Sequence, residues 1–265
     1  MKLIAECATS HAGSVERSLA LVRVAKECGA THVKFQHVDP RHFKPNAVWR
    51  GWNLREWYTR CRFSMDQWKR IMRECDSAGI EFLCTPQTLY DFADLVALGI
   101  KEVKVSSDNL TNLPLLRRIV EEEMPCYASI GMATEVELDS ALEILSPLAA
   151  ALTLMVCTSL YPCPPEHVNL NRIYTLWGAK HYVGFSDHTI GHTAVVMAYA
   201  MGVRTFEKHL HSDETRTTLG PDFSDLEDQN DFRWGVKELH DAELVCGNQE
   251  IAPAPGARAA MELTE

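Results

Sequence analysis

Short apolar runs that alternate with helix-like segments are the strongest constraint on the fold of this chain of 265 residues. The alternation predicts strands near residues 3–8, 32–36, 80–85, 101–106, 125–130, 151–158, 181–186 and 204–209. Helix signals separate them: Ser64 with Gln67 and Thr134 with Glu137 read as capping boxes, and segment 14–29 has apolar residues at helical spacing. Strands that alternate with helices form parallel sheets. Eight such units in about 250 residues match a TIM (β/α)8 barrel.

A doubly wound open sheet is the structural alternative. Such a sheet usually carries a glycine-rich phosphate loop after its first strand, and Ser-His-Ala-Gly at 10–13 is not one. We therefore predict an α/β fold with one barrel domain, the catalytic one, over residues 1–245 and a C-terminal tail over 246–265. The long connection 37–63 is rich in tryptophan and arginine. It is either a functional lid or a segment packed on the barrel rim.

Charge and composition narrow the class of protein. A net charge of −10 and a pI near 5.6 argue against a non-specific nucleic-acid binder, which would carry a basic surface. The nine cysteines include no Cys-x-x-Cys pair, which favours reduced, buried thiols over disulfides or zinc. The N-terminus has too short an apolar stretch for a signal peptide, and the run 145–161 is too short and polar for a membrane span. We expect a cytoplasmic protein with no membrane partner.

Polar side chains gather where the predicted strands end. The C-terminal strand ends of a barrel build its active site, and side chains two residues apart on a strand share a face. The same parity turns Asp187 and Lys208 away from the lumen. The inward-facing pairs are Lys34 with Gln36, Ser159 with Tyr161, Ser186 with His188, and His209 with His211; the other strand ends carry Glu6, Thr85, Lys104 with Ser106 and Ser107, and Ser129.

Two histidines end consecutive predicted strands. His188 and His209 are separated by a helix-like segment, 191–202. A strand–helix–strand unit makes its strands parallel neighbours, so the two imidazoles meet in space. Such a pair fits a divalent-metal site, and taken alone it also fits two structural histidines.

Two lysines lie within apolar strand sequence. Lys34 and Lys104 must meet a partner, because an unpaired buried ammonium is very costly. One interpretation is a structural ion pair with Glu6 or another acid. The other is an anion site, because two lysines among hydroxyl groups suit a phosphate or a carboxylate.

An ordered series of motifs resembles the sialic acid synthase family, whose members condense phosphoenolpyruvate (PEP) with a sugar aldehyde. Each motif is short, and their order along the chain makes the resemblance specific. It runs from Ile4 to about Leu226 and comprises residues 4–6, 10–13, 33–36, 84–86, 104–107, 129–132, 159–162, 168–170, 184–189, 207–209 and 220–222.

The resemblance implies a metal-dependent condensation on a TIM barrel. His188 and His209 would hold the metal, typically Mn²⁺, with Mg²⁺ or Co²⁺ as alternatives, and polarise the aldehyde. C3 of PEP would attack that aldehyde, water would add at C2, and phosphate would leave to give a 2-keto-3-deoxy acid. PEP would be held by Lys34, Thr85, Lys104, Ser107, Ser129, Ser159 and Ser186, whereas Glu6, Gln36, Tyr161 and Asp222 would lie near the reacting carbons or the sugar. Glu6 is the candidate for handling the proton of the water.

The chain also departs from the family pattern. Ser10, Ile130 and Val156 replace the usual Asn, Thr and His. Family members usually continue into a small antifreeze-like domain that contacts the N-acyl group of the sugar, and we expect this chain to lack it. The sequence thus predicts a homodimeric PEP-utilising synthase with an atypical acceptor aldehyde. The alternatives are a metal-dependent hydrolase or lyase, which would not need both lysines, and a non-catalytic binding barrel.

Overall fold

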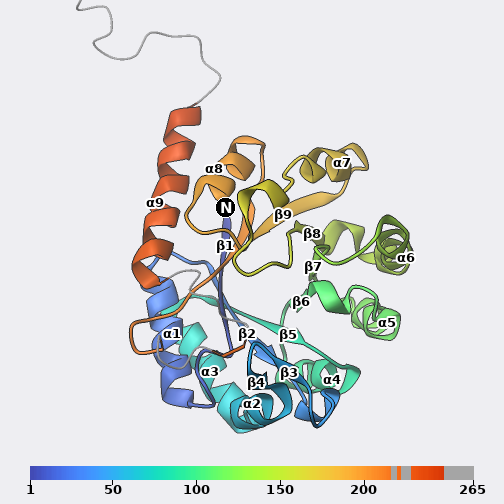
Figure 1. Cartoon of the computed structure of the whole chain (residues 1–265), viewed down its shortest axis with the longest axis vertical. Helices are drawn as coiled ribbons and strands as arrows, with labels where there is room; N and C mark the ends of the chain where they lie inside the picture. Colours follow the sequence, from blue (N-terminus) through green and yellow to red (C-terminus); the bar gives the residue numbers. More distant parts are fainter. Residues whose placement is uncertain (216–219, 222–227, 248–265) are drawn as a thin grey trace, which may run out of the picture.

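The computed structural model describes residues 1–215, 220–221 and 228–247. Eight parallel strands form one sheet that is nearly closed into a barrel (Figure 1). These strands are β1 (Lys2–Ala8), β2 (His32–His37), β5 (Glu81–Pro86), β6 (Val103–Val105), β7 (Cys126–Ser129), β8 (Leu152–Val156), β9 (Tyr182–Asp187) and β10 (Thr205–His209). Each lies where the apolar runs predict it, and the predicted TIM barrel is confirmed.

Helices cover the outside of the sheet (Figure 1). The hydrogen-bonded strand order is β5-β2-β1-β10-β9-β8-β7-β6, and β5 and β6 are also neighbours in space. Each of these strands is followed by a helix of the outer layer. The layer comprises α1 (Val15–Glu27), α3 (Met65–Ala78), α4 (Leu89–Leu98), α5 (Leu113–Glu121), α6 (Glu135–Leu145), α7 (Arg172–Gly178), α8 (Thr193–Ala200) and α9 (Gln229–Cys246).

The predicted capping boxes are present at the N-termini of two helices. Ser64 and Gln67 form the capping box that opens α3, and this helix ends at Gly79 in the left-handed conformation. Thr134 and Glu137 open α6 in the same way. None of the helices in the described part of the chain is long and apolar enough to cross a membrane. All nine cysteines are free thiols, and only Cys246 is exposed.

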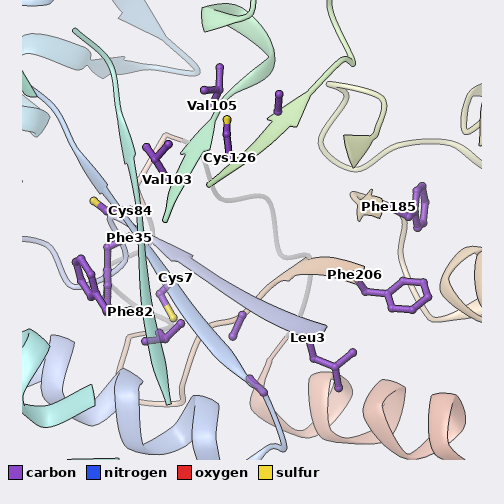
Figure 2. Close-up of a cluster of buried hydrophobic side chains, with 14 of the residues drawn as sticks. Leu3, Cys7, Phe35, Phe82, Cys84, Val103, Val105, Cys126, Phe185 and Phe206 are labelled. Carbon is purple, nitrogen blue, oxygen red and sulfur yellow. The ribbon is translucent and has the colours of Figure 1, made fainter. Parts of the chain in front are cut away.

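Side chains of the sheet alternate between the helix layer and the lumen. Figure 2 shows the outward-facing set, which includes Leu3, Cys7, Phe35, Phe82, Cys84, Val103, Val105, Cys126, Phe185 and Phe206, all part of one buried cluster. The residues between them on each strand face inward. Asp187 and Lys208 belong to the outward set, as predicted. They pair with each other, with Lys208 Nζ 2.7 Å from Asp187 Oδ2.

An apolar layer fills the lumen beneath the strand ends. Ile4, Leu83, Tyr127 and Met155 form a separate buried cluster there. Gly184 makes room for one of them, because a Cβ at that position would lie 2.4 Å from Met155 Sδ. Filled lumens of this kind are typical of TIM barrels. The polar residues that follow on the same strands therefore stand on a packed floor.

The long connection after β2 is folded. It contains a 3₁₀ turn (Pro40–His42), a two-stranded hairpin of β3 (Val48–Trp49) and β4 (Trp52–Asn53), and α2 (Leu54–Cys61). α2 buries Trp57 and Tyr58 against the barrel rim, where Trp57 Nε1 donates to Thr9 Oγ1 at 3.0 Å. The rim-packing interpretation therefore holds for α2. The hairpin keeps Trp49 about half exposed, at 54%.

Gly13 fixes the contact between the turn after β1 and this connection. Its φ is 81°, and a Cβ there would lie 2.1 Å from the carbonyl oxygen of Arg60. Gly99 has a similar φ of 79° with no atom within 4 Å of an added Cβ. Gly99→Ala should lower the free energy of unfolding by about 1–2 kcal/mol through left-handed strain alone. Gly13→Ala should lower the free energy of unfolding clearly more than Gly99→Ala does, as measured by urea unfolding followed by tryptophan fluorescence. Equal decreases for the two variants would contradict the contact between Gly13 and Arg60.

Candidate active site

The C-terminal strand ends surround an open funnel of about 1140 Å³, measured with its open mouth. Almost all of the site residues predicted from the sequence line it, and the funnel brings them together. They are Glu6, Lys34, Gln36, Thr85, Lys104, Ser107, Ser129, Ser159, Tyr161, Ser186, His188 and His209. The remaining one, Asp222, lies outside the described residues. The roles assigned to these residues stay predictions.

His211 does not share the face of His209, contrary to the strand-parity prediction. β10 ends at His209, so the alternation of a strand stops before residue 211. Leu210 N still donates to the carbonyl of Glu6, but His211 forms an isolated bridge with Asp228 and is buried with its Nδ1 3.4 Å from the carbonyl oxygen of Ser212. His211 is therefore not among the residues that line the funnel.

Two buried lysines share one carboxylate at the base of the funnel. Lys34 Nζ lies 2.9 Å from Glu207 Oε2 and 3.2 Å from Glu6 Oε2. Lys104 Nζ lies 3.9 Å from Glu207 Oε1 and donates to Ser129 Oγ at 2.5 Å. Each of the four charged residues is at most 5% exposed. The ion-pair interpretation of Lys34 is therefore correct, and the same lysines still line the open funnel.

Glu207 is the central charged residue of the site that the sequence reasoning missed. Its Oε1 also accepts a hydrogen bond from Ser186 Oγ at 2.8 Å, so it connects β10 with β2, β6 and β9. Strand parity could have found it, because Glu207 lies two residues before His209 and shares its face. The neighbouring polar residues Gln87, Ser106 and Asp108 also line the funnel.

Burial and the shared charges move the pKa values of this cluster apart. Burial alone would raise the pKa of Glu207, but Lys104 and Lys34 outweigh it and lower the pKa to about 2. Burial raises the pKa of Glu6 to about 7, against the opposing pull of Lys34. Burial lowers the pKa of Lys104, whereas Glu207 and Glu6 overcome burial and raise the pKa of Lys34. Glu207 is thus the permanent anion, and Glu6 can exchange a proton near neutral pH.

The two histidines lie side by side as neutral imidazoles. Their ring centroids are 5.6 Å apart, and burial lowers the pKa of His188 to about 4 and that of His209 well below its usual value. His188 Nδ1 donates to the carbonyl of Thr158 at 2.7 Å, which leaves Nε2 with its lone pair. Metal-binding histidines are commonly oriented by such a bond. The pair fits a divalent metal, although no cluster of three or more His, Cys, Asp or Glu ligands exists in the described residues.

Hydroxyl groups complete the wall of the funnel. Thr85 Oγ1 and Ser159 Oγ are buried and have no hydrogen-bond partner among the residues that the structure describes. Ser107 Oγ accepts from Gly131 N at 3.2 Å. Buried polar atoms without partners are uncommon, and here they face an open cavity beside two lysines. The arrangement therefore offers an oxyanion both charge and directional donors.

Comparisons with known proteins agree with this class of barrel and site. Residues 21–251 match the NeuB family, and the chain belongs to that family. It is 31% identical over 268 residues to the N,N'-diacetyllegionaminic acid synthase of Legionella pneumophila, covering 95% of this chain and 75% of that protein. It is 30% identical over 261 residues to a pseudaminic acid synthase of Campylobacter jejuni, covering 94% and 76% of the two chains.

The fold is shared with a solved synthetase. The crystal structure of N-acetylneuraminic acid synthetase from Leptospira borgpetersenii superposes with a TM-score of 0.85 at 23% identity, over 98% of this chain and 90% of that one. Family membership confirms the prediction of a sialic acid synthase-like, PEP-utilising enzyme. It favours this enzyme over the hydrolase, the lyase and the non-catalytic barrel.

The shared ion cluster makes Lys34 a structural residue as well as a candidate ligand. Lys34→Met should lower the free energy of unfolding by about 3–5 kcal/mol, because it removes the cation paired with Glu6 and leaves Glu207 with Lys104 alone. Adding Glu6→Gln should recover part of the loss. Lys101→Met is the control: Lys101 Nζ lies 3.6 Å from Glu81 Oε2 in an exposed pair, and its loss should have little effect. Urea unfolding measures all three, and equal stability of Lys34→Met and Lys101→Met would refute the cluster.

Proposed function

We propose that this chain condenses PEP with an aldose or another aldehyde to give a 2-keto-3-deoxy acid, using a divalent metal. One observation carries the proposal. Two buried lysines stand beside two neutral histidines in one funnel, together with the hydroxyls of Thr85 and Ser159, which have no hydrogen-bond partner in the described part of the chain. A hydrolase or lyase would use the histidines and a nearby acid, but it has no need of the lysine and hydroxyl cradle.

PEP binds in this cradle through its phosphate and carboxylate groups. A bound anion stabilises the ammonium form of Lys104, whose pKa burial lowers. Lys34 and Lys104 give the charge, and the hydroxyls of Thr85, Ser107, Ser129, Ser159 and Ser186 give the directional hydrogen bonds. The apolar floor formed by Ile4, Leu83, Tyr127 and Met155 keeps the anion at the strand ends.

His188 and His209 hold the metal, for which we propose Mn²⁺, with Mg²⁺ or Co²⁺ as alternatives. When bound, the metal supplies Lewis-acid polarisation of the aldehyde oxygen. Thr158 orients His188 through its carbonyl, so that Nε2 faces the ligand side. The ring of Tyr161 lies 4.2 Å from that of His188 and 5.7 Å from that of His209, which limits solvent at the pair.

Glu6 handles the proton of the attacking water. A carbon–carbon bond forms between C3 of PEP and the aldehyde carbon, water adds at C2, and phosphate leaves. Because burial raises the pKa of Glu6 to about 7, both its protonated and its ionised forms are populated near neutral pH. Gln36 and Tyr161 line the funnel on the acceptor side, and Asp222 keeps its predicted role from the sequence resemblance alone. We further propose a cytoplasmic homodimer and an atypical acceptor.

Turnover tests the reaction directly. The protein should release phosphate from PEP in the presence of Mn²⁺ and one member of a panel of aldoses, with a new 2-keto acid detected by mass. Lys104→Met should lose PEP binding in calorimetry, because it removes a buried cation of the cradle, whereas Lys101→Met should keep it. Absence of PEP binding to the unaltered protein would overturn the proposal. PEP binding without product from any aldehyde would favour a non-catalytic barrel.

His188→Ala tests the metal site apart from the reaction. Removing one of two ligands should weaken Mn²⁺ binding by about a hundredfold or more, as measured by electron paramagnetic resonance. Far-UV circular dichroism should show the fold retained. The control is His240→Ala, because that side chain is 61% exposed on α9 and outside the funnel. Turnover that persists unchanged after complete chelation would contradict the role assigned to His188.

A further inference from the structure

The hairpin of the long connection presents one arginine at the funnel mouth. β3 and β4 pair with Val48 opposite Asn53 and Trp49 opposite Trp52, so the turn consists of Arg50 and Gly51 alone. Both turn residues have positive φ, 48° and 82°. This is the conformation of a two-residue hairpin turn whose twist matches its strands. The turn therefore sets the direction in which Arg50 leaves the hairpin.

The base of the hairpin is anchored to the barrel. The ring of Trp52 lies 4.7 Å from that of Trp57, whose Nε1 donates to Thr9 Oγ1 at 3.0 Å. Tyr58, on the same helix α2, donates from its hydroxyl to Gln36 Oε1 at 3.1 Å. These contacts tie the hairpin to the ends of β1 and β2.

Arg50 reaches across the mouth to the loop that follows β8. Its guanidinium donates to the carbonyl of Tyr161, and it lies 5.9 Å from the ring centroid of Trp49. Trp49, Arg50 and Tyr161 all line the funnel. A guanidinium has five N–H donors in a planar fork, so one bond to a carbonyl leaves donors for a ligand.

The charge of Arg50 differs from that of the other cations of the funnel. Lys34 and Lys104 are buried at the base and face Glu207, with Glu6 also beside Lys34. Arg50 is exposed, and within residues 1–215, 220–221 and 228–247 its only polar contact is the carbonyl of Tyr161. Within the described part of the chain no acid forms an ion pair with Arg50, so its positive charge stands at the mouth without a counter-charge there.

We propose that Arg50 is a specificity-determining residue that binds a phosphate or carboxylate at the end of the acceptor remote from its aldehyde. The inference rests on the proposed function, which places the aldehyde at His188 and His209. Arg50 contacts Tyr161, and the ring of Tyr161 packs on His188. An acceptor whose aldehyde lies at the histidines and whose other end extends toward the mouth therefore comes within reach of the guanidinium. PEP is the other source of an anionic group, but its cradle lies at the buried base of the funnel.

The experiment compares anionic and neutral acceptors in steady-state kinetics. Aldohexoses and their 6-phosphates, together with a hexuronate, are assayed with the unaltered protein, Arg50→Gln, Arg50→Lys and Lys44→Ala. Arg50→Gln should raise KM for the anionic acceptor about tenfold or more, and should change KM for PEP and for neutral aldoses less than about twofold. Arg50→Lys should keep most of the preference because it keeps the charge. Lys44 is the matched control, an exposed cation of the same connection that does not line the funnel.

Each outcome decides the inference apart from the proposed function. Turnover confined to neutral aldoses, or equal effects of Arg50→Gln on neutral and anionic acceptors, would overturn the inference and leave the reaction intact. A rise in KM for PEP alone would assign the anion to PEP and also overturn it. If no acceptor turns over, the proposed function fails, and calorimetry of an aldohexose 6-phosphate still compares binding to the unaltered protein and to Arg50→Gln. Equal affinity there would overturn the inference.

Discussion

The whole site depends on the buried carboxylate of Glu207 between two lysines. A lysine in the lumen of a barrel needs a partner, and the outward faces of the same strands are filled by apolar side chains. Glu207 satisfies Lys34 and Lys104 together and also accepts from Ser186, so one residue of β10 connects to side chains of β2, β6 and β9. Removing Lys34 would leave Glu6 without its cation and Glu207 with Lys104 alone, so the same residues carry the structural and the chemical role of this cluster.

Neighbouring carboxyl and imidazole groups of the funnel have different protonation states. Glu207 is held ionised by its lysines, Glu6 is left with a pKa of about 7, and the two histidines are kept neutral by burial. A neutral imidazole is what a divalent metal requires, and a carboxyl near its pKa is what proton transfer to or from water requires. The packed floor beneath these groups closes the lumen below them with buried side chains.

Periodicity in the sequence predicted the barrel and most of its funnel, because both follow from strand alternation. The same rule would have placed Glu207 beside His209, and it failed for His211 because β10 ends two residues earlier. The hairpin of residues 48–53 was beyond such reasoning. Its strands have two residues each, too few for any period, and its position depends on contacts of Trp57 and Tyr58 with residues far away in the sequence.

The same contrast between strands and connections distinguishes the residues proposed to bind PEP from the one proposed to bind the anion of the acceptor. Most residues of the proposed PEP cradle lie on the strands, where the alternation that forms the barrel also aims the side chains. The residue proposed to bind the remote anion of the acceptor, Arg50, lies instead on a connection, where a single residue can change without disturbing the sheet. Relatives that share the barrel and make different acids are consistent with this division. Under the proposed role of Arg50, the long connection selects the acceptor, and in the described residues it brings to the mouth an aromatic hairpin with one exposed arginine.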